Sequence, residues 1–256
     1  MSSGSNDIPA RTSASSPEGA NSPTSVYRSW EYAKQGDYHR NIDPSWAYAP
    51  TYFRKMAYID SLIAPLPAET RIVDIGCGEG VLVEKYIAQG RRIEGLDLNY
   101  RSPLVRQGNI LEMPYPEGSF DAALALDVIE HLQFNKQLQA LREVHRILTP
   151  GGLFIAAIPN LAHLNSRIRL LLKGELDRCD LENDHPGERP MAENRDLLFE
   201  AGFKIERIKG ITLSVPWLYR RVICRHAVRL RWLHDALDRI AAPALAMLDV
   251  FVCRRE

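Results

Sequence analysis

The chain has 256 residues, which is enough for one large α/β domain with additions and too few for two full domains. Hydrophobic residues make up 45% of the chain and charged residues 25%, so burial of apolar side chains is expected to order most of it. The 32 basic and 32 acidic residues balance, which argues against a surface devoted as a whole to a polyanion such as nucleic acid.

The cysteines predict neither a metal site nor a disulfide framework, because they are widely spaced and form no Cys-x-x-Cys pair. They are Cys77, Cys179, Cys224 and Cys253. The sequence has no cationic start followed by an apolar run, and no uninterrupted apolar stretch of membrane-spanning length. We therefore expect a protein of the reducing cytoplasm.

The N-terminal part of the chain divides into a tail and a cap. Residues 1–25 are rich in Ser, Pro, Gly and Ala, and we expect them to be disordered. Residues 26–69 form a predicted aromatic-rich cap with an amphipathic helix at 51–63. The apolar face of this helix is expected to carry Phe53, Met56, Ile59 and Ile63. The cap is a candidate lid over a bound acceptor, and packing of its rings on the domain is the alternative.

Residues 70–256 form the predicted main domain, in which short β-rich runs alternate with helical patterns. The predicted strands are residues 71–75, 92–97, 104–110, 121–126, 152–158, 203–209 and 247–254. The predicted helices are residues 80–89, 136–148 and 191–201. Strands that alternate with helices need crossover connections, which predicts a doubly wound α/β fold with a mostly parallel sheet.

Two predicted insertions, near residues 160–190 and 211–245, interrupt this alternation. The first holds a short basic amphipathic stretch at 166–173. The second combines many arginines with apolar residues at steps of three and four, which predicts a basic helix at 217–240. Such a helix could hold an anionic glycan, a lipid phosphate or a membrane surface, and a solvated helix packed on the domain is the alternative.

A glycine-rich turn follows the first strand of the main domain. Residues 73–80 read Val-Asp-Ile-Gly-Cys-Gly-Glu-Gly and lead into a helix, whose N-terminus offers unpaired N–H groups to a ligand. About twenty residues later the second strand ends at Asp97, a position from which a carboxylate can accept hydrogen bonds from ribose hydroxyls. A tight structural turn is the alternative for the glycines taken alone.

The spacing of the glycines discriminates between two classes of nucleotide-binding protein. A nicotinamide dinucleotide fingerprint needs a third glycine at position 81, where this chain has Val81. The turn with its preceding Asp74 instead resembles the Asp-x-Gly-x-Gly-x-Gly motif of class I S-adenosylmethionine-dependent methyltransferases. Later segments resemble this family in the same order. They are residues 108–121, 126–132, 142–152 and 201–203.

The resemblance implies a Rossmann-like fold with a seven-stranded, mostly parallel sheet, an antiparallel last strand, an N-terminal cap and two insertions. It is nearest to the methyltransferases of ubiquinone and menaquinone biosynthesis and of natural products and glycans. Two departures stand out. The family often has Asp where Asn109 stands, although an amide can also bind adenine. The interval from Asp97 to Asn109 is too short for the customary crossover helix, so one face of the sheet is expected to be thin there.

The same resemblance assigns the residues that would bind the cofactor, S-adenosylmethionine. The motif turn would line the methionine end, the end of the second strand the ribose, residues 109–110 the adenine, and residues 126–127 the surroundings of the methyl group. The residues so assigned are Asp74, Gly76, Cys77, Gly78, Gly80, Asp97, Leu98, Asn109, Ile110, Leu126 and Asp127.

His131 is the candidate catalytic base, because a hydroxyl acceptor must lose its proton and this histidine follows the fourth predicted strand. An imidazole that only packs beside the donor is the alternative. Some ubiquinone-pathway relatives hold a divalent cation with similar residues, which here would be Asp127, Glu130, His131 and His185. We expect no metal, since the Glu-His pair is also common in metal-free relatives.

The sequence therefore predicts an enzyme that methylates a small-molecule, lipid-linked or glycan acceptor, on oxygen. Nucleic acid is disfavoured as acceptor by the neutral charge, and peripheral membrane contact through the 217–240 helix is a candidate interaction. A non-catalytic partner or scaffold that binds S-adenosylmethionine is the alternative function. The sequence identifies neither the acceptor itself nor the oligomeric state.

Overall fold

The computed structural model describes residues 38–40, 42, 48–176, 185–215 and 229–256. The predicted tail at 1–25, most of the aromatic cap before Tyr48, and half of the predicted 217–240 helix lie outside the described residues. Two of the cysteines, Cys179 and Cys224, lie outside them as well.

A seven-stranded sheet with the order β3-β2-β1-β4-β5-β7-β6 forms the centre of the domain. All neighbouring strands run parallel except β7, which is antiparallel to both β5 and β6. The strands are β1 (Arg71–Ile75), β2 (Arg92–Asp97), β3 (Val105–Gln107), β4 (Phe120–Leu126), β5 (Leu148–Pro159), β6 (Phe203–Ile211) and β7 (Leu248–Arg255). The predicted fold class is confirmed.

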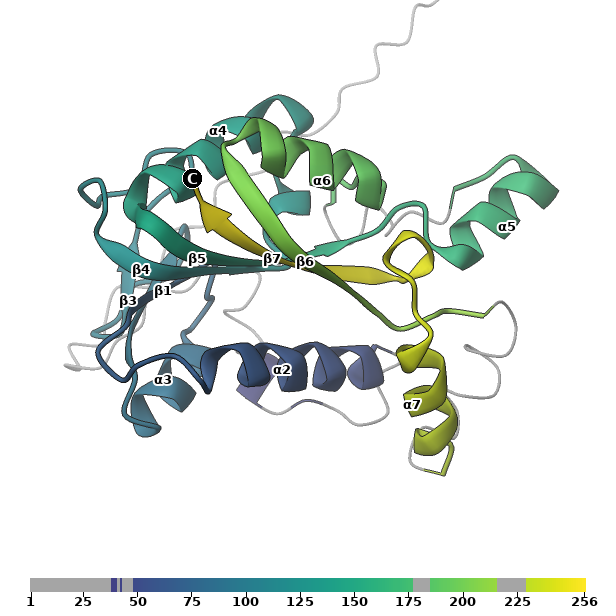
Figure 1. Cartoon of the computed structure of the whole chain (residues 1–256), viewed down its shortest axis with the longest axis horizontal. Coiled ribbons are helices and arrows are strands. Elements are labelled where there is room, and N and C mark those ends of the chain that lie inside the picture. The colour runs from purple at the N-terminus through teal and green to yellow at the C-terminus, as the bar shows by residue number, and fades with distance from the viewer. Residues whose placement is uncertain (1–37, 41, 43–47, 177–184, 216–228) are drawn as a thin grey trace, which may run out of the picture.

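Helices cover both faces of the sheet in a three-layer arrangement (Figure 1). On one face lie α2 (Ala49–Ile63) and α3 (Val81–Ala88), and on the other α4 (Phe134–Ile147) and α6 (Met191–Glu200). Each pair buries its apolar side against a separate hydrophobic cluster of the sheet. Because the central strands are covered on both sides, they are mostly apolar and do not alternate, as in the sequence Phe-Asp-Ala-Ala-Leu-Ala-Leu of β4.

The connection from β2 to β3 contains no helix, as the short interval predicts. Residues 98–104 make a turn in which the Ser102 and Val105 backbones bond to each other, and β3 then pairs with the end of β2. The predicted strand at 104–110 was too long. It ends at Gln107, because the N–H of Gly108 donates to the carbonyl of Asp97 and Asn109 then pairs with Glu112 in a turn.

The predicted face of α2 was partly wrong. The helix buries Thr51, Lys55, Ile59 and Ile63, which recur at steps of four, whereas Phe53 is 50% exposed. Phe53 was expected on the buried face because it lies at helical spacing from Met56, Ile59 and Ile63. A buried lysine on the apolar face was not expected, and it lies beside the candidate site described below.

Two helices stand at the end of the molecule where β5 and β6 finish (Figure 1). Helix α5 (Leu164–Lys173) follows β5, and α7 (Arg231–Arg239) precedes the short helix η6 (Pro243–Leu245) and β7. Helix α7 is the described part of the predicted basic helix, and its Asp235 and Asp238 form ion pairs with Arg54 of α2. None of the helices in the described ranges is long and apolar enough to cross a membrane.

Candidate functional site

The glycine-rich turn lies at the carboxyl edge of the sheet, between β1 and α3. The N–H of Gly76 donates to the carbonyl of Leu96 over 2.7 Å, which ties the turn to the neighbouring strand β2. Gly76 has φ +71°, and a Cβ there would lie 2.5 Å from a Val128 methyl group. Gly80 has φ +85° at the start of α3, where a Cβ would meet Val105 at 2.8 Å. The turn thus needs glycine at both positions.

Asp97 lies directly beside this turn, as the spacing predicts. Its carboxylate accepts hydrogen bonds from the backbone N–H groups of Gly78, Asn99 and Tyr100, at 2.9, 2.8 and 3.2 Å. Three amide donors from two segments hold the acid at the end of β2 and join the glycine turn to it. A fixed carboxylate at this edge is suited to accept further hydrogen bonds from a ligand's hydroxyl groups.

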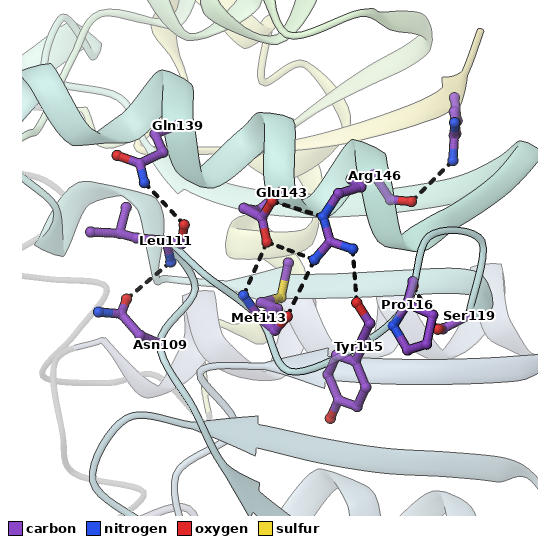
Figure 2. Close-up of polar contacts among 10 residues, drawn as sticks. Asn109, Leu111, Met113, Tyr115, Pro116, Ser119, Gln139, Glu143 and Arg146 are labelled. Carbon is purple, nitrogen blue, oxygen red and sulfur yellow. Dashed lines mark hydrogen bonds and ion pairs between the residues drawn. The ribbon is translucent and has the colours of Figure 1, made fainter.

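The segment after β3 closes the same edge. The Asn109 side chain is exposed and accepts a hydrogen bond from the N–H of Leu111 at 3.0 Å, while Ile110 is buried at 9% exposure. Figure 2 shows how α4 holds this loop: Glu143 accepts from the N–H of Met113, and Arg146 donates to the carbonyl of Tyr115. Because the Glu143 and Arg146 side chains also pair with each other, the loop is fixed on a rigid helix.

Three other residues that the resemblance assigns to the cofactor, Cys77, Leu98 and Leu126, differ in how far they are buried. The Cys77 side chain packs against Gly95, where a Cβ added to the glycine would come within 2.4 Å of the cysteine sulfur, so this side chain points into the domain. Leu98 is 58% exposed just after Asp97. Leu126 is half-buried and packs against the cluster beneath α2 and α3.

The end of β4 carries a partly buried ion pair that the sequence did not predict. Asp127 has φ +56°, and its Oδ2 accepts from the Lys55 ammonium of α2. The Lys55 side chain is only 3% exposed, and its ammonium lies 5.2 Å from the centre of the Tyr52 ring. The other carboxylate oxygen of Asp127 is buried without a hydrogen bond in the described structure. The sequence did contain a sign of this burial, because Lys55 recurs with Thr51, Ile59 and Ile63 at steps of four and so lies on the same face of the helix.

Asp74, at the base of the turn, is 4% exposed. Burial and the nearby charge of Asp97 raise the pKa of its carboxyl group to about 7, against the opposing effect of the Lys55 charge. Asp74 is therefore poised to ionise near neutral pH, and a cation placed beside it would favour the ionised form.

Glu130, His131 and His185 come together beyond β4. Their potential metal-ligating atoms lie within 4.8 Å of one another, and the rings of His131 and His185 meet edge to face with centroids 4.5 Å apart. The N–H of Gly187 donates to the carbonyl of Glu130, which holds the two segments together. His131 is exposed, whereas Glu130 is fully buried, and burial and the charge of Asp127 raise its carboxyl pKa well above the usual range. Asp127 is not part of this group, because it binds Lys55.

A second unpredicted residue is Arg40, in the short helix η1 (Tyr38–Arg40) of the cap. Its guanidinium binds the carboxylates of Glu79, in the glycine turn, and Glu84, on α3, at 2.9 Å each. These carboxylates raise the pKa of the guanidinium. The cap is thereby fastened to the turn. A cavity of about 470 Å³ lies at the amino edge of the sheet, beside Arg71 and Arg92, and none of the predicted cofactor-binding residues lines it.

Comparisons with known proteins agree with this geometry. Residues 73–156 match the methyltransferase domain family. A probable S-adenosylmethionine-dependent methyltransferase of Mycolicibacterium smegmatis is 31% identical over 178 residues, which are 66% of this chain and 65% of that protein. A ubiquinone biosynthesis O-methyltransferase of Ralstonia nicotianae is 28% identical over 150 residues, or 52% of this chain and 60% of that protein.

A tRNA (carboxymethyluridine(34)-5-O)-methyltransferase of Arabidopsis thaliana is 26% identical over 122 residues, which are 43% of this chain and 29% of that protein. Among solved structures, an S-adenosylmethionine-dependent methyltransferase of Thermotoga maritima has a TM-score of 0.55 at 18% identity, covering 88% of this chain and 97% of that one. At this identity the likeness establishes the fold. The chain spans less than two thirds of the length of these curated relatives.

Proposed function

We propose, from the premise that the chain carries a class I S-adenosylmethionine-dependent methyltransferase domain, that it is an enzyme that transfers the donor's methyl group to an oxygen of a small-molecule, lipid-linked or glycan acceptor. One observation carries the proposal: the glycine turn, Asp97 and the clamped Asn109 loop meet at the carboxyl edge of β1, β2 and β3. In open α/β sheets this edge is where ligands bind.

The residues present fit the donor. Gly76 leaves space that a side chain would fill, Asp97 offers a fixed acceptor for the ribose hydroxyls, and Asn109 and Ile110 would flank the adenine. The buried Asp127 oxygen that lacks a hydrogen bond would face the methionine end, together with Asp74. Two acidic side chains there suit the positive charges of the sulfonium and ammonium groups.

The sulfonium of the bound donor supplies an activated methyl group, so the protein has mainly to align the acceptor and exclude water. Asp97 and the glycine turn would fix the donor. His131, exposed beyond β4, would accept the proton of a hydroxyl acceptor, and His185 would hold its ring in place through the edge-to-face contact. Lys55 would keep Asp127 in its place beside the donor.

Oxygen as the methylated atom is supported by the match to a ubiquinone biosynthesis O-methyltransferase. The matches to tRNA methyltransferases make RNA the competing acceptor class, but they cover smaller shares of both chains. The balanced charge of this chain also favours a small or lipid-linked acceptor over RNA.

Calorimetry with S-adenosylmethionine and isotope-labelled transfer to pools of small molecules, lipid extracts and RNA test the proposal together. Donor binding with labelled product in a non-RNA pool is the expected result. Donor binding without labelled product in any pool would favour the non-catalytic partner. Labelled RNA would make RNA the acceptor class in place of the proposed ones. No donor binding at all would refute both functions.

Replacing His131 with asparagine should lower turnover with a hydroxyl acceptor by about two to four orders of magnitude, because the proton would lose its acceptor. Donor affinity should stay near that of the parent, since His131 is proposed to contact the acceptor and not the donor. The His185→Asn variant is the matched control and should lose much less activity. Equal activity of the His131→Asn variant and the parent would leave His131 as a packing residue.

Treatment with a chelator should leave turnover unchanged. Transfer from an activated sulfonium needs no Lewis acid, and Asp127, one of the four candidate ligands, is held by Lys55. Activity is to be compared before chelation, after it, and after addition of magnesium. Loss of activity that magnesium restores would make Glu130, His131 and His185 a cation site.

Donor affinity should rise by about ten-fold between about pH 6 and pH 8, because Asp74 has a pKa of about 7 and the cationic donor favours its ionised form. In the protein without donor, the raised pKa affects stability instead. Because ionisation of Asp74 disfavours the folded state, the contribution of this group to the free energy of unfolding is lost as the pH rises from about 4 to about 7. Calorimetry across this range, with Asp74→Asn as the control, checks the first effect. An affinity that rises equally in the control would assign the titration to another group.

A further inference from the structure

Helix α5 projects from the carboxyl end of β5, beyond the edge of the sheet (Figure 1). Its first turn is anchored to the domain. Ser166 is fully buried, His163 caps the helix by accepting from the Ser166 N–H, and Arg167 donates to the carbonyl of Ala244 near η6. The base of the helix is therefore fixed, whereas its far end extends into solvent.

The far end carries three consecutive exposed leucines. Leu170, Leu171 and Leu172 are 48%, 85% and 75% exposed. Successive residues of an α-helix are separated by about 100° around the axis, so these three side chains cover about 200° of it. The tip is thus apolar around most of its circumference, which is unusual for a solvated helix end.

Basic side chains accompany the apolar tip. Helix α5 contains Arg167, Arg169 and Lys173 and no acidic residue, and the carboxylate of Glu175, just after the helix, binds Arg169 at 3.1 Å. Long basic side chains can extend from an apolar surface to reach phosphate groups above it. An apolar tip with adjacent cations has the chemistry of a segment that enters the interface of an anionic bilayer.

We propose that the tip of α5, residues 170–173, docks this protein on anionic membrane surfaces, with the three leucines among the acyl chains and Lys173 and Arg169 at the lipid phosphates. A groove on a protein partner would instead receive a stripe of side chains at steps of three and four, along one face of the helix. Leucines that point in directions spread over about 200° suit a fluid apolar layer and not a one-sided groove.

The position of α5 bears on the class of acceptor, and this step rests on the proposed function. Helix α5 follows the carboxyl end of β5, at the edge where the acceptor is proposed to bind. Docking through α5 would hold this edge near the bilayer, which selects a lipid-linked acceptor from the three proposed classes. The sequence made the 217–240 helix a candidate for membrane contact, and half of that range lies outside the described residues. The present proposal places the contact on the other insertion.

Flotation of the full chain with vesicles tests the docking. The parent is expected to float with vesicles of phosphatidylcholine and phosphatidylglycerol and only weakly with phosphatidylcholine alone. Replacing both Leu171 and Leu172 with glutamate should lower the bound fraction by about ten-fold or more, because it removes apolar area and adds charge repelled by the lipid. Lys173→Glu should reduce chiefly the preference for anionic vesicles.

Phe199→Glu is the control, because Phe199 is 75% exposed and the change adds a glutamate to a different helix, α6. It should float like the parent. Donor calorimetry on every variant reports folding and the proposed function separately from docking. A parent that does not float, or a leucine variant that floats equally well, would overturn the proposal. So would a concentration-dependent dimer on gel filtration that the leucine variant abolishes, because a second copy would then occupy the tip.

Discussion

Replacing Lys55 with methionine is expected to lower the free energy of unfolding by about 2–3 kcal/mol. The Lys55 side chain is 3% exposed and pairs with Asp127, whose side chain is 27% exposed, so removal of the ammonium leaves a partly buried carboxylate uncompensated. Methionine keeps the length and the apolar contacts of the side chain, so the loss reports the charge and not a cavity. Urea denaturation followed by circular dichroism measures it.

The matched control is Lys85→Met. Lys85 also pairs with an aspartate, Asp60, but both partners are about 40% exposed, so solvent screens the interaction. The expected loss is about 1 kcal/mol or less. If both methionine variants lost the same small amount of unfolding free energy, the Lys55–Asp127 pair would contribute no more than an exposed pair. The double variant Lys55→Met with Asp127→Asn should recover part of the stability, because it removes both charges.

Replacing Asp97 with alanine is expected to weaken donor affinity by about 3 kcal/mol, or roughly a hundred-fold. The carboxylate is proposed to accept from both ribose hydroxyls, and each hydrogen bond to a charged group contributes about 1.5 kcal/mol or more. Titration calorimetry with S-adenosylhomocysteine, which undergoes no reaction, gives the affinity. Asp121→Ala is the matched control, since Asp121 pairs with Arg71 at the opposite edge of the sheet and should leave affinity unchanged.

Asp97 also binds three backbone N–H groups, so its loss could act through the turn and not through the ribose. A donor analogue without the ribose hydroxyls separates the two effects. The parent should bind this analogue about a hundred-fold more weakly, and the alanine variant should lose little further affinity with it. If the losses of binding free energy from Asp97→Ala and from removal of the ribose hydroxyls added fully, Asp97 would support the turn without touching the ribose.

Local patterns were sufficient for much of the fold and for the position of the glycine-rich turn. Strands β1 and β2 were predicted with the observed bounds, because short apolar runs that end in Gly or Asp admit few other structures. The turn at residues 76–80 and Asp97 were placed correctly because parallel neighbouring strands bring their carboxyl ends to one edge. The missing helix between β2 and β3 followed from chain length alone.

Other features escaped the sequence because they depend on packing between distant segments. Phe53 was expected inside and is half exposed, since the register of α2 on the sheet is set by Thr51, Lys55, Ile59 and Ile63 together. Predicted strand 104–110 ended early because Asp97 and Gly108 bond across the turn. The roles of His131 and the cofactor-binding residues remain predictions.

The sequence by itself determined the fold class and the motif that resembles one methyltransferase family, because strand period, glycine spacing and loop length are properties of neighbouring residues. Only the tertiary structure decided that Lys55 pairs with Asp127, that Arg40 fastens the cap to Glu79, and that the leucines of α5 face solvent. The physical reason is that burial and charge pairing depend on the distances between elements far apart in the chain, and no local pattern fixes those distances.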